Sequence, residues 1–285
     1  MYLTEERVFE LKKIAGSVRK TILETVHYAN AGHVGGPFSA TDMLVTLYFD
    51  IMNLKPEDPK WDGRDRFVLS KGHSALALYS VLGHRGYFPI EEMKTFDRLH
   101  SRFQAHPDMT VLPGLDMSTG SLGQGISTAV GMALGAKKMA KDFTVYCMVG
   151  DGETQEGQVW EAAEIAYRYQ LDNLIVFMDY NKLQQYGWKG KDQPRDIPVV
   201  NPAKKWEAFG WNVLEINGHD YQEIVRACQD AKKQKGKPTV IVANTIKGKG
   251  VSFMQNQYLW HSKVPTDEEL AKAFAEIDGE VNINV

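Results

Sequence analysis

Short apolar runs separated by amphipathic segments make up most of the chain. Five runs of four to seven residues are rich in branched and aromatic side chains and lack an alternating polar face. This pattern is typical of strands that are buried on both sides. The predicted strands cover residues 67–70, 144–149, 174–180, 211–216 and 239–244.

Apolar residues recur with helical spacing in the segments between these runs. The clearest predicted helices cover residues 5–28, 40–51, 122–138, 159–169 and 221–233. Strands that alternate with helices of this length predict an α/β fold, a parallel sheet with helices on both faces. No repeat or linker divides the sequence, so we expect a single domain over residues 1–285, in which residues 263–285 form an acidic C-terminal helical tail.

Charge and composition narrow the class of protein further. The 285 residues include 33 basic and 36 acidic side chains, and this mixture with a net charge of -3 gives no basic surface for nucleic acid or membranes. The N-terminus has no signal-peptide core, and no apolar stretch is long enough to span a bilayer. Two distant cysteines fit reduced thiols. We therefore expect a cytoplasmic protein that binds small molecules and other proteins.

Polar residues follow two of the predicted strands, where a parallel sheet binds ligands. Gly150-Asp151-Gly152-Glu153 comes after the strand at 144–149, and Asn181 comes directly after the strand at 174–180. In a βαβ unit these strand ends lie close together, so the Asp151 carboxylate and the Asn181 amide oxygen can converge. Such oxygens suit Mg²⁺, which usually keeps phosphate oxygens among its ligands. Glycines beside Asp151 let the backbone approach phosphate closely.

Simpler interpretations of these residues carry less weight. Asp151-Gly152 could be a hairpin turn, but a helical pattern follows it instead of a strand. The sequence contains no GxxxxGK[ST] motif and no GxGxxG motif after a strand, so nucleoside triphosphate and nicotinamide binding lose their main support.

Seven motifs together resemble the N-terminal part of transketolase, a thiamine-diphosphate enzyme, over roughly residues 11–262. They are AGHVGGPFSATDML around His33, SKGHSALALY around His73, AHPDM around His106, DMSTGSLGQGIS, GDGETQEGQVWEAA, DYNKLQ, and TIKGKGVSFMQ followed by WHS around His261. The order and context of four histidines make this resemblance far more specific than GDG alone.

The resemblance implies a thiamine-diphosphate-binding fold with a divalent cation, Mg²⁺ or in its place Ca²⁺ or Mn²⁺. The implied metal ligands are Asp151, Asn181 and the carbonyl of Leu183. The implied cofactor-binding residues are His73, Gly120, Leu122, Gly150, Asp151, Gly152, Glu153 and Asn181.

The resemblance also implies roles for further side chains. The histidines His33, His73, His106 and His261 would be catalytic, since imidazole suits proton transfer to and from sugar hydroxyls near neutral pH. Glu156 and Glu161 match acidic positions at the family's subunit interface. The sequence departs from the family at Gln185-Tyr186-Gly187, where an apolar residue, Asp and Gly are more usual, and this change beside the metal loop concerns substrate preference.

The implied reaction is the reversible transfer of a two-carbon ketol unit from a ketose phosphate to an aldose phosphate. The family's full chain continues into a second domain, which carries the glutamate that activates the cofactor and basic residues that bind the sugar phosphate, and this sequence has no segment to supply it. We therefore expect the N-terminal subunit of a split transketolase, joined by a separately encoded C-terminal subunit in an α2β2 assembly. A shortened piece of a longer protein is the alternative; an initial Met and the lack of a tag-like sequence favour a natural subunit.

Other functions stay open at this point. The chain could belong to another two-subunit thiamine enzyme, such as a 2-oxo acid dehydrogenase or a relative of deoxyxylulose-phosphate synthase, although GHVGG, SKGHSA and AHPDM argue against both. A transketolase for an unusual ketose phosphate or a sulfosugar is a further alternative. A regulatory homologue without activity is a non-enzyme alternative, and the intact Asp151, Asn181 and histidine set weighs against it.

Overall fold

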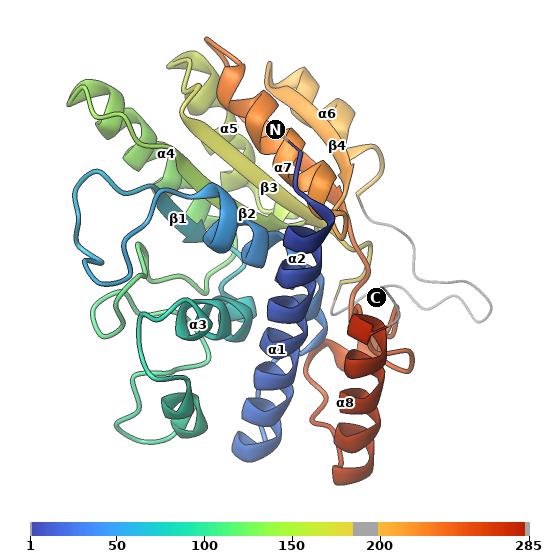
Figure 1. The fold of residues 1–285 in the computed structure, drawn as a ribbon. Coiled ribbons are helices and arrows are strands. Elements are labelled where there is room, and N and C mark those ends of the chain that lie inside the picture. The colour runs from blue at the N-terminus through green and yellow to red at the C-terminus, as the bar shows by residue number, and fades with distance from the viewer. Residues whose placement is uncertain (1, 185–198, 283–285) are drawn as a thin grey trace.

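The strands predicted from apolar runs pair side by side in the computed structural model, which describes residues 2–184 and 199–282. Within these residues a sheet of five parallel strands has the order β1-β2-β3-β5-β4 (Figure 1). Its members are β1 (Arg66–Leu69), β2 (Val145–Gly150), β3 (Leu174–Tyr180), β4 (Asn212–Asn217) and β5 (Thr239–Asn244). The predicted parallel α/β fold is confirmed.

Helices connect the strands and cover both faces of the sheet (Figure 1). They are α1 (Glu5–Ala29), α2 (Gly35–Thr46), α3 (Ala75–His84), α4 (Gln124–Lys138), α5 (Gly157–Arg168), α6 (Pro202–Ala208), α7 (Tyr221–Lys233) and α8 (Asp267–Asn282). Strand side chains point alternately to the two faces, so β2 sends Tyr146 and Met148 into one hydrophobic core with α1, α2, α3 and α7. The same strand sends Val145, Cys147 and Val149 into a second core with α4 and α5.

Two predictions about single elements need correction. β4 was expected to be buried on both faces, but it lies at the edge of the sheet, and Ile216 is the one residue of this strand that is buried. The helix expected at residues 40–51 begins five residues earlier, at Gly35, and ends at Thr46, where a short wider turn, Leu47–Ile51, continues it. Every residue of α2 is buried, so no polar stripe in the sequence marks its start.

The predicted C-terminal helical segment packs along α1 (Figure 1). Its Ala273 and Ile277 are buried, and Gly16 of α1 allows the close approach, since an added Cβ there would meet Val281 at 3.1 Å and Ile277 at 3.4 Å. Acidic side chains of α8 pair with basic residues of the preceding loop and of α1, as in Lys249–Glu280 and Lys20–Asp278.

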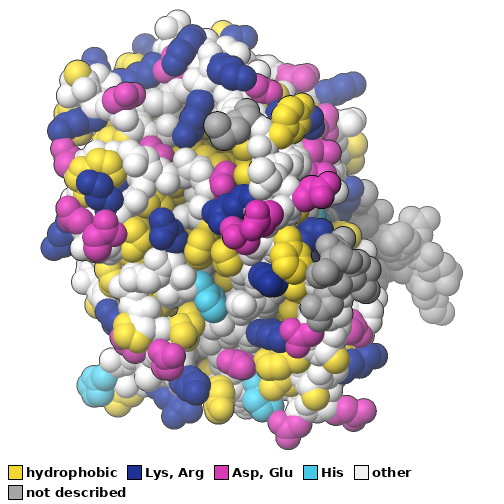
Figure 2. All heavy atoms as spheres, viewed as in Figure 1, with side chains coloured by type: hydrophobic (Ala, Val, Ile, Leu, Met, Phe, Trp, Pro, Cys, Tyr) yellow, Lys and Arg dark blue, Asp and Glu magenta, His cyan; other side chains and the backbone are white. Residues whose placement is uncertain are grey.

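Charges of both signs are mixed over the surface seen in Figure 2, without a large area of one sign. Among the residues that the structure describes, no helix has the length and apolar character needed to cross a membrane.

Candidate functional site at the carboxyl ends of the strands

The ends of β2 and β3 bring the predicted metal residues together. Gly150 lies opposite Asp179 in the parallel register, so Asp151 follows one strand where Asn181 follows its neighbour. Asp151 is buried, and its carboxylate accepts hydrogen bonds from the backbone N–H groups of Gly152 and Lys182, each at 2.7 Å. Burial, and then the nearby Asp179 carboxylate, raises the pKa of Asp151 to about 6. A divalent cation at this point would stabilise the charged carboxylate.

Asn181 and Leu183 complete the set of oxygens expected for the metal. The Asn181 amide donates to Asp179 Oδ2 at 3.2 Å, and this contact turns its Oδ1 towards the Leu183 N–H, which lies 3.1 Å away. Each acceptor oxygen keeps a second lone pair beyond these bonds. One carboxylate, one amide oxygen and one carbonyl fit a hard cation that also takes phosphate oxygens. Among the described residues no three His, Cys, Asp or Glu side chains converge as a metal site, and the predicted set, with a single carboxylate, is not of that kind.

Two buried lysines stand beside these oxygens, and neither was assigned a role from the sequence. Lys71 is 1% exposed and pairs with Asp179, which also accepts a hydrogen bond from Ser39 at 2.6 Å. Burial alone would raise the pKa of Asp179, but the Lys71 ammonium and the hydrogen bonds lower it below its usual value. Lys247 is 2% exposed and donates to the Leu183 carbonyl at 3.2 Å. Lys71 lies in the motif SKGHSALALY and Lys247 in TIKGKGVSFMQ, each directly before a glycine. This position was the one sign in the sequence that they belong to the site.

Glu153 ties three segments of the site together rather than pointing into open space. Its carboxylate accepts from the Ser70 hydroxyl at 2.5 Å, from the Gly123 N–H at 2.9 Å and from the Gly150 N–H at 3.0 Å. Burial raises its pKa. The segment after β1, the end of β2 and the start of α4 are thereby fixed to one carboxylate.

Three of the four predicted catalytic histidines form a cluster. The ring centroids of His33 and His261 are 5.0 Å apart, those of His73 and His261 5.3 Å, and those of His33 and His73 5.4 Å. Burial first, then His106, Lys247 and Lys71, lowers the pKa of His33 to about 4. Burial and the Lys71 charge likewise hold the pKa of His73 well below its ordinary value. Both rings are therefore neutral at physiological pH.

His261 is oriented by a buried cation. Lys247 Nζ lies 2.8 Å from His261 Nδ1, and an ammonium group only donates hydrogen bonds. In its neutral form the ring of His261 therefore carries its proton on Nε2.

Three further residues of the predicted site are His106, Gly120 and Leu122. His106 is exposed, and its ring packs on Gly120, where an added Cβ would come within 3.0 Å of it. Gly120 in turn lies against Gly72, since a Cβ at residue 72 would meet the Gly120 nitrogen at 2.6 Å. Leu122 is half-buried two residues before α4. The departure at Gln185-Tyr186-Gly187 lies outside the described residues.

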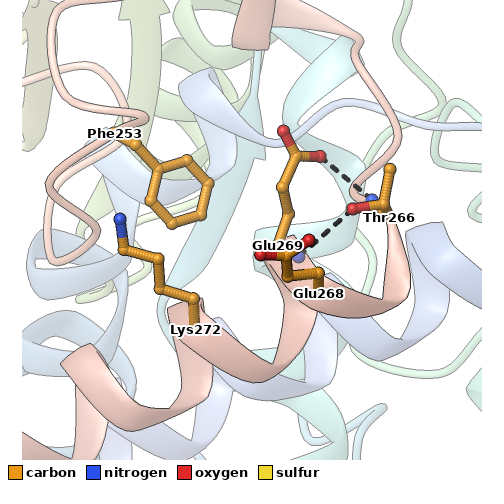
Figure 3. A pocket seen from close by; sticks show the side chains of 5 residues that line it. All are labelled: Phe253, Thr266, Glu268, Glu269 and Lys272. Carbon is orange, nitrogen blue, oxygen red and sulfur yellow. Dashed lines mark hydrogen bonds between the residues drawn. The ribbon is translucent and has the colours of Figure 1, made fainter.

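The two predicted interface glutamates are exposed, Glu156 before α5 and Glu161 within it. A separate pocket of about 380 Å³ lies beside α8, where Phe253, Thr266, Glu268, Glu269 and Lys272 line it (Figure 3). None of the predicted site residues lines this pocket, so it belongs to a different part of the surface.

A parallel sheet with acidic and amide oxygens, buried ammonium groups and neutral imidazoles at its strand ends defines an α/β domain for a phosphate-bearing cofactor. Comparison with known proteins identifies the family. The family described as transketolase, thiamine diphosphate binding domain, matches residues 11–277. The chain therefore belongs to the transketolase family and corresponds to its thiamine-diphosphate-binding domain.

Individual relatives agree with this assignment. The chain is 46% identical to a 6-deoxy-6-sulfo-D-fructose transketolase subunit of Clostridium sp. (strain MSTE9), over 96% of this chain and 98% of the relative. It is 40% identical to an apulose-4-phosphate transketolase subunit of Actinobacillus succinogenes, over 95% and 97%. The crystal structure of transketolase from Campylobacter jejuni superposes with a TM-score of 0.86 at 36% identity, over 95% of this chain but 43% of that one.

The chain thus matches nearly the whole of proteins named as transketolase subunits and less than half of the longer transketolase. These findings confirm the predicted family, the enzyme class and the thiamine-diphosphate-binding domain. They also confirm the prediction of an N-terminal transketolase subunit, because the chain aligns with nearly the whole length of relatives that are named as transketolase subunits.

Proposed function

We propose that this chain is the cofactor-binding subunit of a split transketolase, which transfers a two-carbon ketol unit from a ketose phosphate to an aldose phosphate. The observation that supports the proposal most is the cluster of three histidine rings, 5.0 to 5.4 Å apart, beside buried Lys71 and Lys247 at the strand ends. A site that neutralises an anion with lysines can keep its imidazoles neutral for proton transfer.

In this proposal Asp151, Asn181 and the Leu183 carbonyl hold Mg²⁺, and with it the cofactor diphosphate. Lys71, which pairs with Asp179, and Lys247 place positive charge beside the diphosphate. When bound, thiamine diphosphate supplies the electron sink that cleavage of a carbon–carbon bond requires. The residues expected to line it are His73, Gly120, Leu122, Gly150, Gly152 and Glu153.

The four histidines move or hold protons on the sugar hydroxyls. His33 and His73, whose pKa values are depressed by burial and by neighbouring cations, offer neutral rings that can accept a proton. His261 presents its Nε2–H as a donor, because Nδ1 faces Lys247. The exposed ring of His106 suits the entrance of the site, where it would contact the terminal hydroxyl of the donor sugar.

A separately encoded C-terminal subunit is the partner in this proposal, in an α2β2 assembly. Glu161 and Ile165 are four residues apart and therefore share one face of α5, and Tyr169 directly follows the helix. Ile165 is 40% and Tyr169 46% exposed. Exposed apolar side chains beside Glu156 and Glu161 suit an interface between subunits.

The proposal also covers location and domain extent. We treat residues 1–285 as one cofactor-binding domain that ends in an acidic helical segment, and we place the protein in the cytoplasm. The two cysteines, Cys147 and Cys228, are buried and unpaired, which fits a reducing compartment.

A sulfosugar is a second candidate for the donor. One relative, 46% identical over almost its full length, is named for 6-deoxy-6-sulfo-D-fructose, and two others are named for apulose 4-phosphate. Both of these sugars are ketoses with an anionic terminal group, so the same proton chemistry would serve them.

The test is reconstitution with a transketolase C-terminal subunit, which is sought first in the neighbouring reading frame. We expect the purified chain alone to transfer no two-carbon unit, and the pair to use at least one donor among xylulose 5-phosphate, fructose 6-phosphate, apulose 4-phosphate and 6-deoxy-6-sulfofructose. Asp151→Ala should abolish activity of the pair, whereas Asp62→Ala, which removes an exposed carboxylate paired with Lys141, should not. Transfer by the chain alone, or full activity of Asp151→Ala at ordinary Mg²⁺, would contradict the proposal.

A further inference from the structure

A buried network outside the predicted site reaches the segment that carries Lys247. At its centre is Asp42 of α2, which is 3% exposed and accepts four hydrogen bonds. Arg19 donates two of them, at 3.0 and 2.7 Å, and Tyr221 and His219 donate one each, at 2.7 Å. Burial opposes its charge, but Arg19 and His219 hold the pKa of Asp42 well below the usual range. Asp42 is therefore a fixed acceptor.

The other nitrogen of His219 reaches the turn after β5. The backbone N–H of Ile246 donates to His219 Nε2 at 2.8 Å, so this nitrogen carries no proton. The single ring proton is then on Nδ1, where it is donated to Asp42. Asp42 thus selects the one tautomer that leaves Nε2 free to accept from Ile246.

The residues on either side of Ile246 are both tied to the site. Thr245 donates from its hydroxyl to Asp179, the partner of Lys71, and Lys247 donates to the Leu183 carbonyl and to His261. The residue after β4 also contacts the end of β5 directly, since the Gly218 N–H donates to the Asn244 carbonyl at 2.8 Å. A displaced Ile246 amide would therefore shift the anchors of both buried lysines.

We propose that His219 is a positioning residue: its Nε2 holds the turn at residues 245–247 in place for the cofactor site, and Asp42 with Arg19 fixes the tautomer that makes this possible. The inference about the turn stands on the chain's own geometry. Its link to cofactor binding rests on the proposed function.

The first measurement uses the unaltered chain without cofactor. Nitrogen NMR of the histidine rings distinguishes the two neutral tautomers and the protonated form. We expect His219 to be protonated on Nδ1 alone at neutral pH. A proton on Nε2, in either the other tautomer or the charged ring, would overturn the inference whatever the function of the chain.

The second measurement compares two substitutions that each place an amide near one of the two ring nitrogens of His219. His219→Asn retains a group near Nδ1 but none near Nε2, whereas His219→Gln extends an amide oxygen towards the Nε2 position. We expect amide exchange at Ile246 to become roughly tenfold faster in His219→Asn, the loss of one hydrogen bond, and to recover largely in His219→Gln. His84→Asn, which removes a part-buried ring bonded to Thr21, is the matched control and should leave Ile246 unchanged. Unchanged exchange in His219→Asn would refute the positioning role.

The third measurement is titration of the full chain with thiamine diphosphate and Mg²⁺. His219→Asn should bind several-fold more weakly than the unaltered chain, and His219→Gln should restore most of the affinity. If the turn loosens while affinity stays the same, the link to the cofactor is wrong. If the unaltered chain and the reconstituted pair both fail to bind the cofactor, the proposed function fails, and the tautomer and exchange results still decide the role of His219.

Discussion

Removal of the Lys71 ammonium tests how much the buried Lys71–Asp179 pair stabilises the folded chain. Lys71→Met keeps most of the side-chain volume but leaves Asp179, which is fully buried, without its cation. Breaking a buried pair by removing one partner costs about 3–5 kcal/mol. Ser39, Thr245 and Asn181 still donate to Asp179, so we expect the lower end, about 3 kcal/mol.

This loss converts into a measurable shift in Tm. An unfolding entropy of about 2.1 cal/mol/K per residue gives about 0.6 kcal/mol/K for 285 residues, so Tm should fall by about 5 °C. Calorimetry of the cofactor-free chain measures it. The double variant Lys71→Met with Asp179→Asn removes both charges and should recover much of the loss.

A matched control separates burial from charge. Lys141→Met removes an exposed ammonium that pairs with Asp62, and surface pairs of this kind contribute about 0–1 kcal/mol. A Tm of Lys71→Met within 1 °C of that of the unaltered chain, or a double variant less stable than Lys71→Met alone, would show that the buried pair does not stabilise the fold in this way.

Three further predictions concern the histidines and one glycine. The pKa of His33 is about 4 in the folded chain, against an ordinary value of 6.5, so the unfolded chain binds this proton first as pH falls. Up to about 3 kcal/mol of folding stability is therefore lost as pH falls from 6.5 to 4, and it is regained as pH rises. An NMR titration of the His33 ring with a midpoint near 6.5 would contradict this. Gly125→Ala places a Cβ 2.6 Å from the Ser70 Cα and should destabilise the chain by about 1–3 kcal/mol in urea unfolding, whereas Gly131→Ala in the same helix, with open space around it, should be neutral or stabilising. In the reconstituted pair, His106→Ala should lower kcat/KM roughly 10²- to 10⁴-fold, and the exposed His100→Ala should leave it unchanged; equal activity of the two variants would argue against a proton-transfer role for His106.

Elements with a strong local pattern could be predicted from the sequence. The strands β3 and β5 agree with their predicted bounds because continuous apolar runs give a clear signal. The edge position of β4 depends on which strand pairs with β5, and the run at 211–216 carries no information on that pairing. The start of α2 was hidden for a similar reason, since a helix buried all round has no amphipathic stripe.

Site residues were predictable where chain position alone brings them together. Asp151 and Asn181 follow adjacent parallel strands, and that topology is a local property of a βαβ unit. The positions of Lys71 and Lys247, and the role that we propose for His219, could not be predicted because each depends on burial and on partners far along the chain, such as Asp179 for Lys71 and Asp42 for His219. A sequence pattern does not distinguish a buried lysine from an exposed one.

The burial of Lys71 and Lys247 determines how the site responds to the surrounding electrolyte. At physiological ionic strength, dissolved ions weaken interactions between exposed charges beyond about 8 Å, but they screen buried charges much less. These ammonium groups are only 1% and 2% exposed, so dissolved counter-ions cannot approach them closely. The neighbouring protein groups therefore determine the electric field around them. The Lys71–Asp179 pair and the Lys247 ammonium therefore keep their electrostatic interactions in concentrated salt, where a lysine–aspartate pair on the surface would lose most of its attraction.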